Sequence, residues 1–277
     1  MSALIAVFGC GGPETGKTDA PRPAQEDGKK KVEEAAPAAA PARADLPNAE
    51  ELLAAVVEAS GGAARLDAIT SFYQELKVEM PGVGISGTGK SWAKGQDWYL
   101  ELSLPGVGVT MSGGKDGKLW ALDPIQGLRT LSGKEAEAAA MGASINLAHD
   151  WRRFFKKAET TKVVEEGGAK IAEVTLTAES GIEVVLRIDL GTHRVIGQRL
   201  KQYSPMGEIP VEVTLSDYRE QDGVWVAFEQ LADMKLQKIK TVTTKLEFGV
   251  PVDESKFAQP GSEAAAQAAE PAKAEAK

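Results

Sequence analysis

The chain has 277 residues and a formal net charge of −8, from 40 acidic and 32 basic residues. This acidic balance disfavours nucleic acid as a partner. No run of about 20 apolar residues occurs, so the sequence predicts no membrane-spanning helix. With a single cysteine there can be no internal disulfide, and the folded part has to be stabilised by an apolar core.

The single cysteine lies near the N-terminus, at the end of a short apolar segment. Residues 4–9 read LIAVFG and precede Cys10. An apolar segment that ends in VFGC resembles the lipobox of bacterial lipoproteins, in which the chain is cut before the cysteine and the thiol carries the lipid. The segment is short and lacks basic residues, which a start codon placed too far downstream would explain. We expect residues 1–10 to be a lipoprotein signal remnant and Cys10 to be the lipid attachment site. The alternative is a cytoplasmic protein with a short apolar N-terminal segment and a lone buried cysteine.

A phosphate-binding pattern follows directly. Residues 11–18 read GGPETGKT and match G-x-x-x-x-G-K-T. Such a loop needs a helix immediately after the Lys-Thr pair, so that backbone N–H groups point at the phosphates. Pro21 and Pro23 stand there instead, and two prolines this close prevent a helix from forming. The sequence therefore predicts no nucleotide site.

Composition divides the rest of the chain into three parts. Residues 11–45 are rich in Gly, Pro, Ala, Lys and Glu, a mixture that predicts a disordered tether. Residues 261–277 have a similar composition and predict a disordered tail. Residues 46–260 are long enough to bury a core, so we expect them to form one domain of roughly 210 residues.

Three segments of this domain carry helix signals. A capping box at 48–51 precedes an apolar face, and the glycines at 61–62 predict the end of this first helix. A second capping box at 132–135 predicts an Ala-rich helix that runs to Met141. Residues 150–157 mix aromatic and basic side chains and predict a third helix, with the aromatic residues on the domain and the basic residues in water.

The rest of the domain alternates apolar and polar residues. A period of two runs through 98–104, 182–188 and 209–215, as expected for strands with one buried face. Turn signals recur between such runs, among them the pairs at 105–106 and 222–223. Because short turns link antiparallel neighbours, we expect about ten or eleven strands in one large antiparallel sheet.

A sheet of this size curls or closes because its strands twist. The predicted fold class is therefore mainly β (α+β): a large curved antiparallel sheet that forms an unclosed β-barrel with a few covering helices. A barrel of more than about eight strands has more interior than its own side chains fill, which leaves room for an apolar ligand. The candidate cavity residues lie on the apolar strand faces and are Trp98, Leu100, Leu102, Leu104, Val184, Leu186, Val211 and Val213.

Basic residues of the third predicted helix form a second candidate site. Arg152, Arg153, Lys156 and Lys157 are candidates to meet lipid phosphates at the mouth of the cavity. The alternative is an ordinary solvated helix face.

Signals for catalysis or metal binding are weak. His149 and His193 fall in different segments without Glu or Cys at ligand spacing, so we expect no metal site. No G-x-S-x-G motif occurs, and the lone cysteine precedes the domain, which leaves no candidate nucleophile. The sequence therefore predicts a protein that is not an enzyme and uses no cofactor. An enzyme of unknown type is a third and weaker hypothesis.

Several segments of the domain match the pattern of one family. They are GGAARLDAI at 61–69, DYR at 217–219, DGVWVAF at 222–228, a Lys/Thr-rich strand that ends at Phe248, and DESKF at 253–257 with Pro260 after it. Together they resemble the outer-membrane lipoprotein-sorting proteins, relatives of the LolA and LolB lipoprotein carriers, over most of 48–260. The resemblance implies an unclosed antiparallel barrel with a helical lid and a hydrophobic cavity. Relatives tend to have Pro where this chain has Ala227, and no acyl-binding residue is carried over by these segments.

The resemblance also implies a function. It implies a lipoprotein of the bacterial cell envelope, lipid-anchored at the outer membrane and facing the periplasm, that binds a lipid or acyl moiety in its barrel. The expected partners are lipid or lipoprotein acyl chains, the membrane and an envelope protein. The alternative is an envelope-stress sensor or protein-interaction module on the same fold, without lipid transfer. Lipid that co-purifies would favour the first hypothesis, and a stable protein partner would favour the second.

Overall fold

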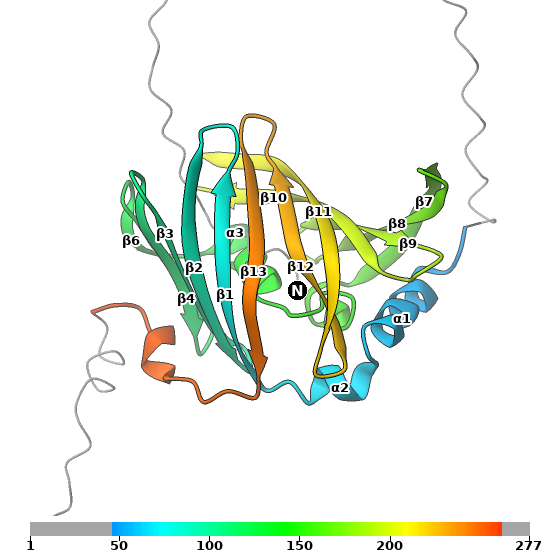
Figure 1. The fold of residues 1–277 in the computed structure, drawn as a ribbon, viewed down its shortest axis with the longest axis horizontal. Coiled ribbons are helices and arrows are strands. Elements are labelled where there is room, and N and C mark those ends of the chain that lie inside the picture. Colours follow the sequence, from blue (N-terminus) through cyan, green and yellow to red (C-terminus); the bar gives the residue numbers. More distant parts are fainter. Residues whose placement is uncertain (1–45, 262–277) are drawn as a thin grey trace, which may run out of the picture.

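The structure is a computed structural model that describes residues 46–261. Thirteen strands form one antiparallel sheet in the order β6-β5-β4-β3-β2-β1-β13-β12-β11-β10-β9-β8-β7. This order is linear, so β6 and β7 are the two edges of the sheet and the barrel is not closed (Figure 1). The predicted fold class, a curved and unclosed antiparallel barrel with covering helices, is confirmed.

The elements have the following bounds. The strands are β1 (Ser71–Met80), β2 (Ile85–Lys94), β3 (Asp97–Leu104), β4 (Gly108–Lys115), β5 (Lys118–Asp123), β6 (Gly127–Thr130), β7 (Lys157–Glu166), β8 (Ala169–Thr177), β9 (Glu183–Asp189), β10 (Val195–Ser204), β11 (Gly207–Gln221), β12 (Val224–Asp233) and β13 (Lys238–Phe248). The helices are α1 (Ala49–Ala59), α2 (Ala63–Asp67), α3 (Gly133–Gly142), α4 (Trp151–Phe154) and the 3-10 helix η2 (Glu254–Phe257). Within residues 46–261, no helix has the length and apolar composition needed to cross a membrane.

The number of strands predicted from the sequence is too low. β6 has only four residues, and none of the ten residues of β7 is buried. A very short strand and a strand without a fully buried side chain leave little apolar alternation in the sequence. The two edge strands are therefore the elements that periodicity detects least well.

The first helix begins as predicted. The side chain of Asn48 accepts hydrogen bonds from the backbone N–H groups of Glu50 (2.9 Å) and Glu51 (3.2 Å). Beyond the end of α1, Gly61 has φ +117°, and a Cβ at this position would lie 2.3 Å from the carbonyl oxygen of Gly223. The close approach requires glycine and places the end of α1 against the turn between β11 and β12.

The predicted cap of the second helix is wrong. Ser132 precedes α3, but its side chain makes no capping hydrogen bond. The carboxylate of Glu135 is instead held by two hydrogen bonds from the guanidinium of Arg129, at 2.7 and 2.8 Å. A bidentate, charge-assisted pair of this kind is stronger than the neutral bonds of a capping box.

The third predicted helix is shorter than expected. α4 covers 151–154 only, and Phe155 has an extended backbone with its side chain buried in the core. The backbone N–H of Lys156 donates to the carbonyl of Thr177 (2.9 Å), and β7 starts at the next residue. Burial of Phe155 and pairing with β8 therefore end the helix after one turn.

Helix α3 connects the two arms of the sheet. It contacts both β5 and β10, which lie far apart in the strand order. Figure 1 shows α3 behind the centre of the sheet, between its arms. The apolar core accordingly has two main parts, one under α1 and α4 against β8 and β9, and one in the arm of β1 to β3 and β13.

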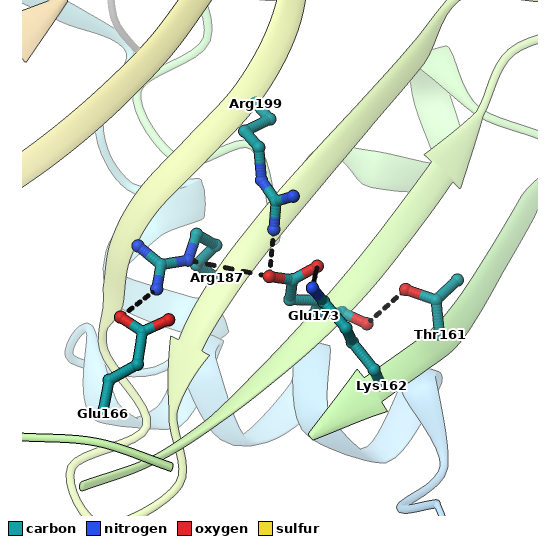
Figure 2. A network of polar contacts seen from close by, with 6 residues as sticks. All are labelled: Thr161, Lys162, Glu166, Glu173, Arg187 and Arg199. Atoms are coloured by element: carbon teal, nitrogen blue, oxygen red, sulfur yellow. Dashed lines mark hydrogen bonds and ion pairs between the residues drawn. The ribbon is translucent and has the colours of Figure 1, made fainter. Parts of the chain in front are cut away.

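A network of charges fastens the strands from β7 to β10 (Figure 2). The carboxylate of Glu173 on β8 is buried and is paired with Arg199, with Lys162 at 3.4 Å and with Arg187 at 3.8 Å. Arg187 also binds Glu166 at 2.6 Å. A buried carboxylate is costly unless it is paired, and here three cations from three different strands surround it.

The C-terminal segment covers the opposite face of β3 from α3. Four rings form a row across neighbouring strands, with centroid distances of 5.0 Å for Tyr73 and Trp92, 5.7 Å for Trp92 and Tyr99, and 6.1 Å for Tyr99 and Trp120. The indole N–H of Trp120 donates to the carbonyl oxygen of Phe257 (2.8 Å), and the Phe257 residue is 0% exposed. This cluster, which we call the aromatic row, fixes η2 to the sheet.

We expect the protein to lose stability at alkaline pH through this row. Burial, together with a hydrogen bond to Glu75 (2.8 Å), raises the pKa of Tyr73 from 10.0 to about 12, and burial also raises the pKa of Tyr99. Because folding favours the neutral phenol, its contribution is complete below pH 10 and is lost as the pH rises from 10 towards 12. The free energy of unfolding, measured by urea denaturation at a series of pH values, should therefore fall above pH 10, and less steeply in Tyr73→Phe. An equally steep fall in that variant would contradict the assignment.

Candidate functional site

A cavity of about 450 Å³ opens between α2, α3 and the adjoining ends of β1 to β5. We call it the wide cavity. Its apolar wall includes Phe72, Trp98 and Leu119, and its polar side includes Asp67, His149 and Arg153. Ligand sites in proteins commonly measure about 300–1,000 Å³ and combine apolar walls with a few polar groups. The wide cavity has both properties.

A chain of hydrogen bonds runs along the polar side of the wide cavity. Nε2 of His149 lies 3.1 Å from a carboxylate oxygen of Asp67, and Nδ1 lies 2.9 Å from Asp150. The Ser144 hydroxyl donates to the other carboxylate oxygen of Asp150 (2.7 Å). Because this hydroxyl is bound to Asp150 and not to His149, these residues do not form a pair of nucleophile and base. Their contacts connect α2 to the segment before α4.

A smaller cavity of about 90 Å³ lies between α3 and the strands β3, β9 and β10. We call it the narrow cavity. Leu100, Met141, Val184 and Tyr203 are among the residues that line it, and α3 contributes small side chains such as Ala138. The surroundings are therefore mostly apolar.

Trp98 belongs to the walls of both cavities. It is 5% exposed, and its indole Nε1 has no hydrogen-bond partner among the described residues. On the facing strand, a Cβ on Gly114 would lie 3.2 Å from this nitrogen and 2.1 Å from Leu119, so glycine leaves room for the indole. Buried donors are almost always hydrogen-bonded, so this unpartnered donor, on a residue that lines both cavities, is a candidate contact for a ligand.

The comparison with known proteins finds proteins of similar fold. The sequence matches no protein-family profile and no curated protein. A LolA superfamily protein from Nitrosomonas europaea superposes with a TM-score of 0.54 at 12% identity, covering 77% of this chain and 98% of that chain. A DUF1329 family protein from Desulfovibrio piger gives 0.52 at 12% identity, with 77% and 98% covered. A Vibrio parahaemolyticus domain assigned to the outer membrane lipoprotein-sorting proteins gives 0.51 at 14% identity, with 76% and 97% covered.

The chain has the LolA fold. Within this LolA-like barrel, the eight cavity residues proposed from the sequence are in two kinds of surroundings. Trp98, Leu100 and Val184 line the cavities next to α3, and Leu186 lines a third, smaller cavity beside the end of α1. These four residues face space that side chains do not fill.

The other four are packed against protein atoms. Leu102 and Leu104 are buried with residues of β1 and β13, and Val211 and Val213 are buried with Ala232 on β12. None of them lines the three cavities described above. In the LolA-like barrel, the interior between these strands is therefore filled by its own side chains.

The four basic residues proposed as a headgroup rim are also divided. Arg153 lines the wide cavity, and its guanidinium lies 4.7 Å from the ring centre of Phe154. The other three are ion-paired: Arg152 with Glu50 at 2.7 Å, Lys156 with Glu179, and Lys157 with Glu159 at 2.7 Å. A single basic residue of the proposed rim therefore reaches the mouth of this cavity.

The sequence did not predict that α3 lines both cavities, or that Asp67 and His149 lie on the polar side of the wide cavity. An Ala-rich helix inside a β-sheet protein is a signal for close packing, but its sequence does not show which alanines face a void.

Cys10 and the segments 11–45 and 262–277 lie outside the described residues. Within 46–261, no three His, Cys, Asp or Glu side chains are arranged to hold a metal ion.

Proposed function

We propose that this chain is a lipid-anchored lipoprotein of the cell envelope that binds an acyl chain in the cavities beside α3, and that it is not an enzyme. The observation that carries this proposal is the junction at Trp98, where a wide cavity with a polar side meets a narrow apolar one. A lipid needs the same two surroundings, one for its headgroup and one for its chain. Each methylene that leaves water contributes about 0.8 kcal/mol to binding.

In this proposal the acyl chain lies against Trp98, Leu100 and Val184, and a carboxylate or ester oxygen accepts a hydrogen bond from the indole N–H of Trp98. The headgroup lies in the wide cavity near Arg153. The narrow cavity, at about 90 Å³, is smaller than the roughly 300 Å³ of the smallest common ligand sites. A whole chain therefore enters only if α3 moves away from the sheet.

Two further observations support an envelope location. The fold is shared with the Vibrio parahaemolyticus domain assigned to outer membrane lipoprotein sorting. The sequence before Cys10 resembles a lipobox, which would attach the chain to a membrane facing the periplasm, in this proposal the outer membrane. The proposed partners are lipid or lipoprotein acyl chains and the membrane itself.

Mass spectrometry of the native protein tests the proposal. Expressed in its own host, the protein should carry a diacylglycerol on Cys10 and release an extractable lipid from the barrel. Cys10→Ser should move it from the detergent phase to the soluble fraction without removing the bound lipid. An intact Met1 with a free thiol in the cytosol would refute the anchor. A barrel without lipid that takes up no acyl probe would favour the sensor or interaction module.

Trp98→Phe should separate recognition of the headgroup oxygen from burial of the chain. The variant keeps an aromatic ring but loses the unpartnered donor. A hydrogen bond contributes about 0.5–1.5 kcal/mol, so a fluorescent fatty acid should bind about two- to tenfold more weakly. A probe with an alkyl chain but no acceptor oxygen serves as the control and should bind equally well to both proteins. Equal weakening for both probes would show that the indole acts by its shape alone.

A further inference from the structure

The turns of the sheet fall into two sets, one at each end of the strands. Because all neighbouring strands are antiparallel, the turns β1–β2, β3–β4, β5–β6, β8–β9, β10–β11 and β12–β13 share one end. The pairing of Glu79 with Lys240 places the β1–β2 turn beside the β12–β13 turn. Figure 1 shows these two turns at the top of the sheet.

Exposed apolar side chains gather at this end. Five of its six turns present one each: Val83, Val107, Ile125, Met206 and Leu236. We call these five residues the apolar tips. Their exposed fractions include 67% for Ile125 and 101% for Leu236. The other exposed large apolar residues of the described chain, Val109, Leu128 and Ile209, lie within the first three residues of the strands that follow such turns.

The five turns that carry the apolar tips hold only one charged residue. The turns read PGVG at 81–84 and again at 105–108, PIQG at 124–127 and PMG at 205–207, without a charged residue. The fifth turn carries one basic residue, Lys235, beside Leu236. The sixth turn at this end, β8–β9, carries Glu179 and no apolar tip. At the other end, Asp116 lies in β4–β5 and Asp222 in β11–β12, whereas the β2–β3 and β7–β8 turns are uncharged. Exposed apolar residues that share one end of the sheet are candidates for a contact that removes them from water.

The shape of the surface indicates what covers it. The tips project from separate hairpins, and none of them lines any of the three cavities described above. A protein partner is held by a shaped, well-packed interface, whereas the boundary between lipid headgroups and acyl chains accepts single apolar side chains wherever they enter. Proline and glycine favour short turns, so the apolar side chain is the largest group that projects from the end of each hairpin.

We infer that the apolar tips form a membrane-contact surface that enters the headgroup boundary of a lipid bilayer. This inference goes beyond the proposed function, because it needs neither a lipid on Cys10 nor a ligand in the barrel. The proposed tether at 11–45 would reach about 120 Å when fully extended, so an anchor at Cys10 leaves either end of the sheet free to meet the membrane. The tips then orient the barrel on the membrane, with the wide cavity towards the other ends of the strands.

Site-specific labelling of the full chain tests the orientation. Cys10→Ser leaves no cysteine, so one new cysteine can be labelled with an environment-sensitive dye. With vesicles of phosphatidylcholine and phosphatidylglycerol, a dye at Ile125→Cys should shift to the blue. A dye at Thr192→Cys, an exposed position in the β9–β10 turn, is the matched control and should not shift. A shift at Thr192→Cys alone, or at neither position, would overturn the inference.

A combined variant tests the energetics. Val107→Ser, Ile125→Ser and Leu236→Ser, introduced together into the Cys10→Ser chain, change exposed side chains and should leave the fold intact. Co-sedimentation with the same vesicles should weaken by about tenfold or more. Uptake of a fluorescent fatty acid should not change, which separates this inference from the proposed function. Unchanged sedimentation would overturn it, as would a dimer in sedimentation velocity that the three substitutions dissociate, because a second copy would then cover the tips.

Discussion

The Phe257→Ala variant is expected to lose about 3–5 kcal/mol of its free energy of unfolding. Phe257 is 0% exposed and packs with Tyr99 and Trp120 on the face of the sheet opposite α3. The hydrogen bond from Trp120 ends on the backbone carbonyl of Phe257, so the substitution keeps that acceptor and removes only the ring. The loss in free energy of unfolding should therefore measure how much the packing of the Phe257 ring against the aromatic row stabilises the fold.

Urea denaturation followed by tryptophan fluorescence provides the measurement. Leu236→Ala is the control, because it truncates an apolar side chain that is fully exposed, and its free energy of unfolding should stay within about 0.5 kcal/mol of the original. A loss below about 1 kcal/mol in Phe257→Ala would show that the C-terminal segment contributes little to the stability of the sheet.

Ala138→Leu is expected to weaken uptake of a fluorescent fatty acid by about tenfold or more. Ala138 lines the narrow cavity, and the larger side chain takes up space that the proposed ligand needs. Displacing two methylenes from an apolar site costs about 1.6 kcal/mol, and 1.4 kcal/mol corresponds to a tenfold change in affinity. Because the new side chain fills a void, the melting temperature should not fall.

Ala54→Leu is the matched control for this variant. Ala54 is an exposed residue of α1, so the same change adds the same atoms outside the barrel. Fluorescence titration should give the original affinity for Ala54→Leu and a much lower one for Ala138→Leu. Equal affinities in both variants would place the acyl chain elsewhere than beside α3.

The two capping-box signals had different outcomes. The capping box at 48–51 gave a correct helix start, because Asn48 bonds to backbone groups two and three residues away. The similar signal at 132–135 gave a wrong cap, because Glu135 is bound to Arg129, which lies on β6. A pattern in the sequence does not show such a competing partner.

The site depends on contacts that periodicity does not contain. Alternation along β3 shows that Trp98, Leu100 and Leu102 share a face, and this face is buried. Trp98 and Leu100 line cavities and Leu102 does not, because α3 covers only part of the strand. Where α3 crosses the sheet is decided by its contacts with β5 and β10, and these contacts join distant parts of the chain.

The two unpaired edges at β6 and β7 bear on how selective the barrel can be. In a closed barrel, strand number and stagger determine the circumference, and the interior has a single size. Here the circumference is not determined in this way, since the arms of the sheet are joined across the interior by one helix of ten residues. In this linear strand order β6 and β7 do not pair with each other, so no hydrogen bond between strands fixes the distance between the two edges. For the acyl ligand that we propose, this open circumference predicts binding of chains of different lengths, with headgroup selectivity set at the mouth of the wide cavity.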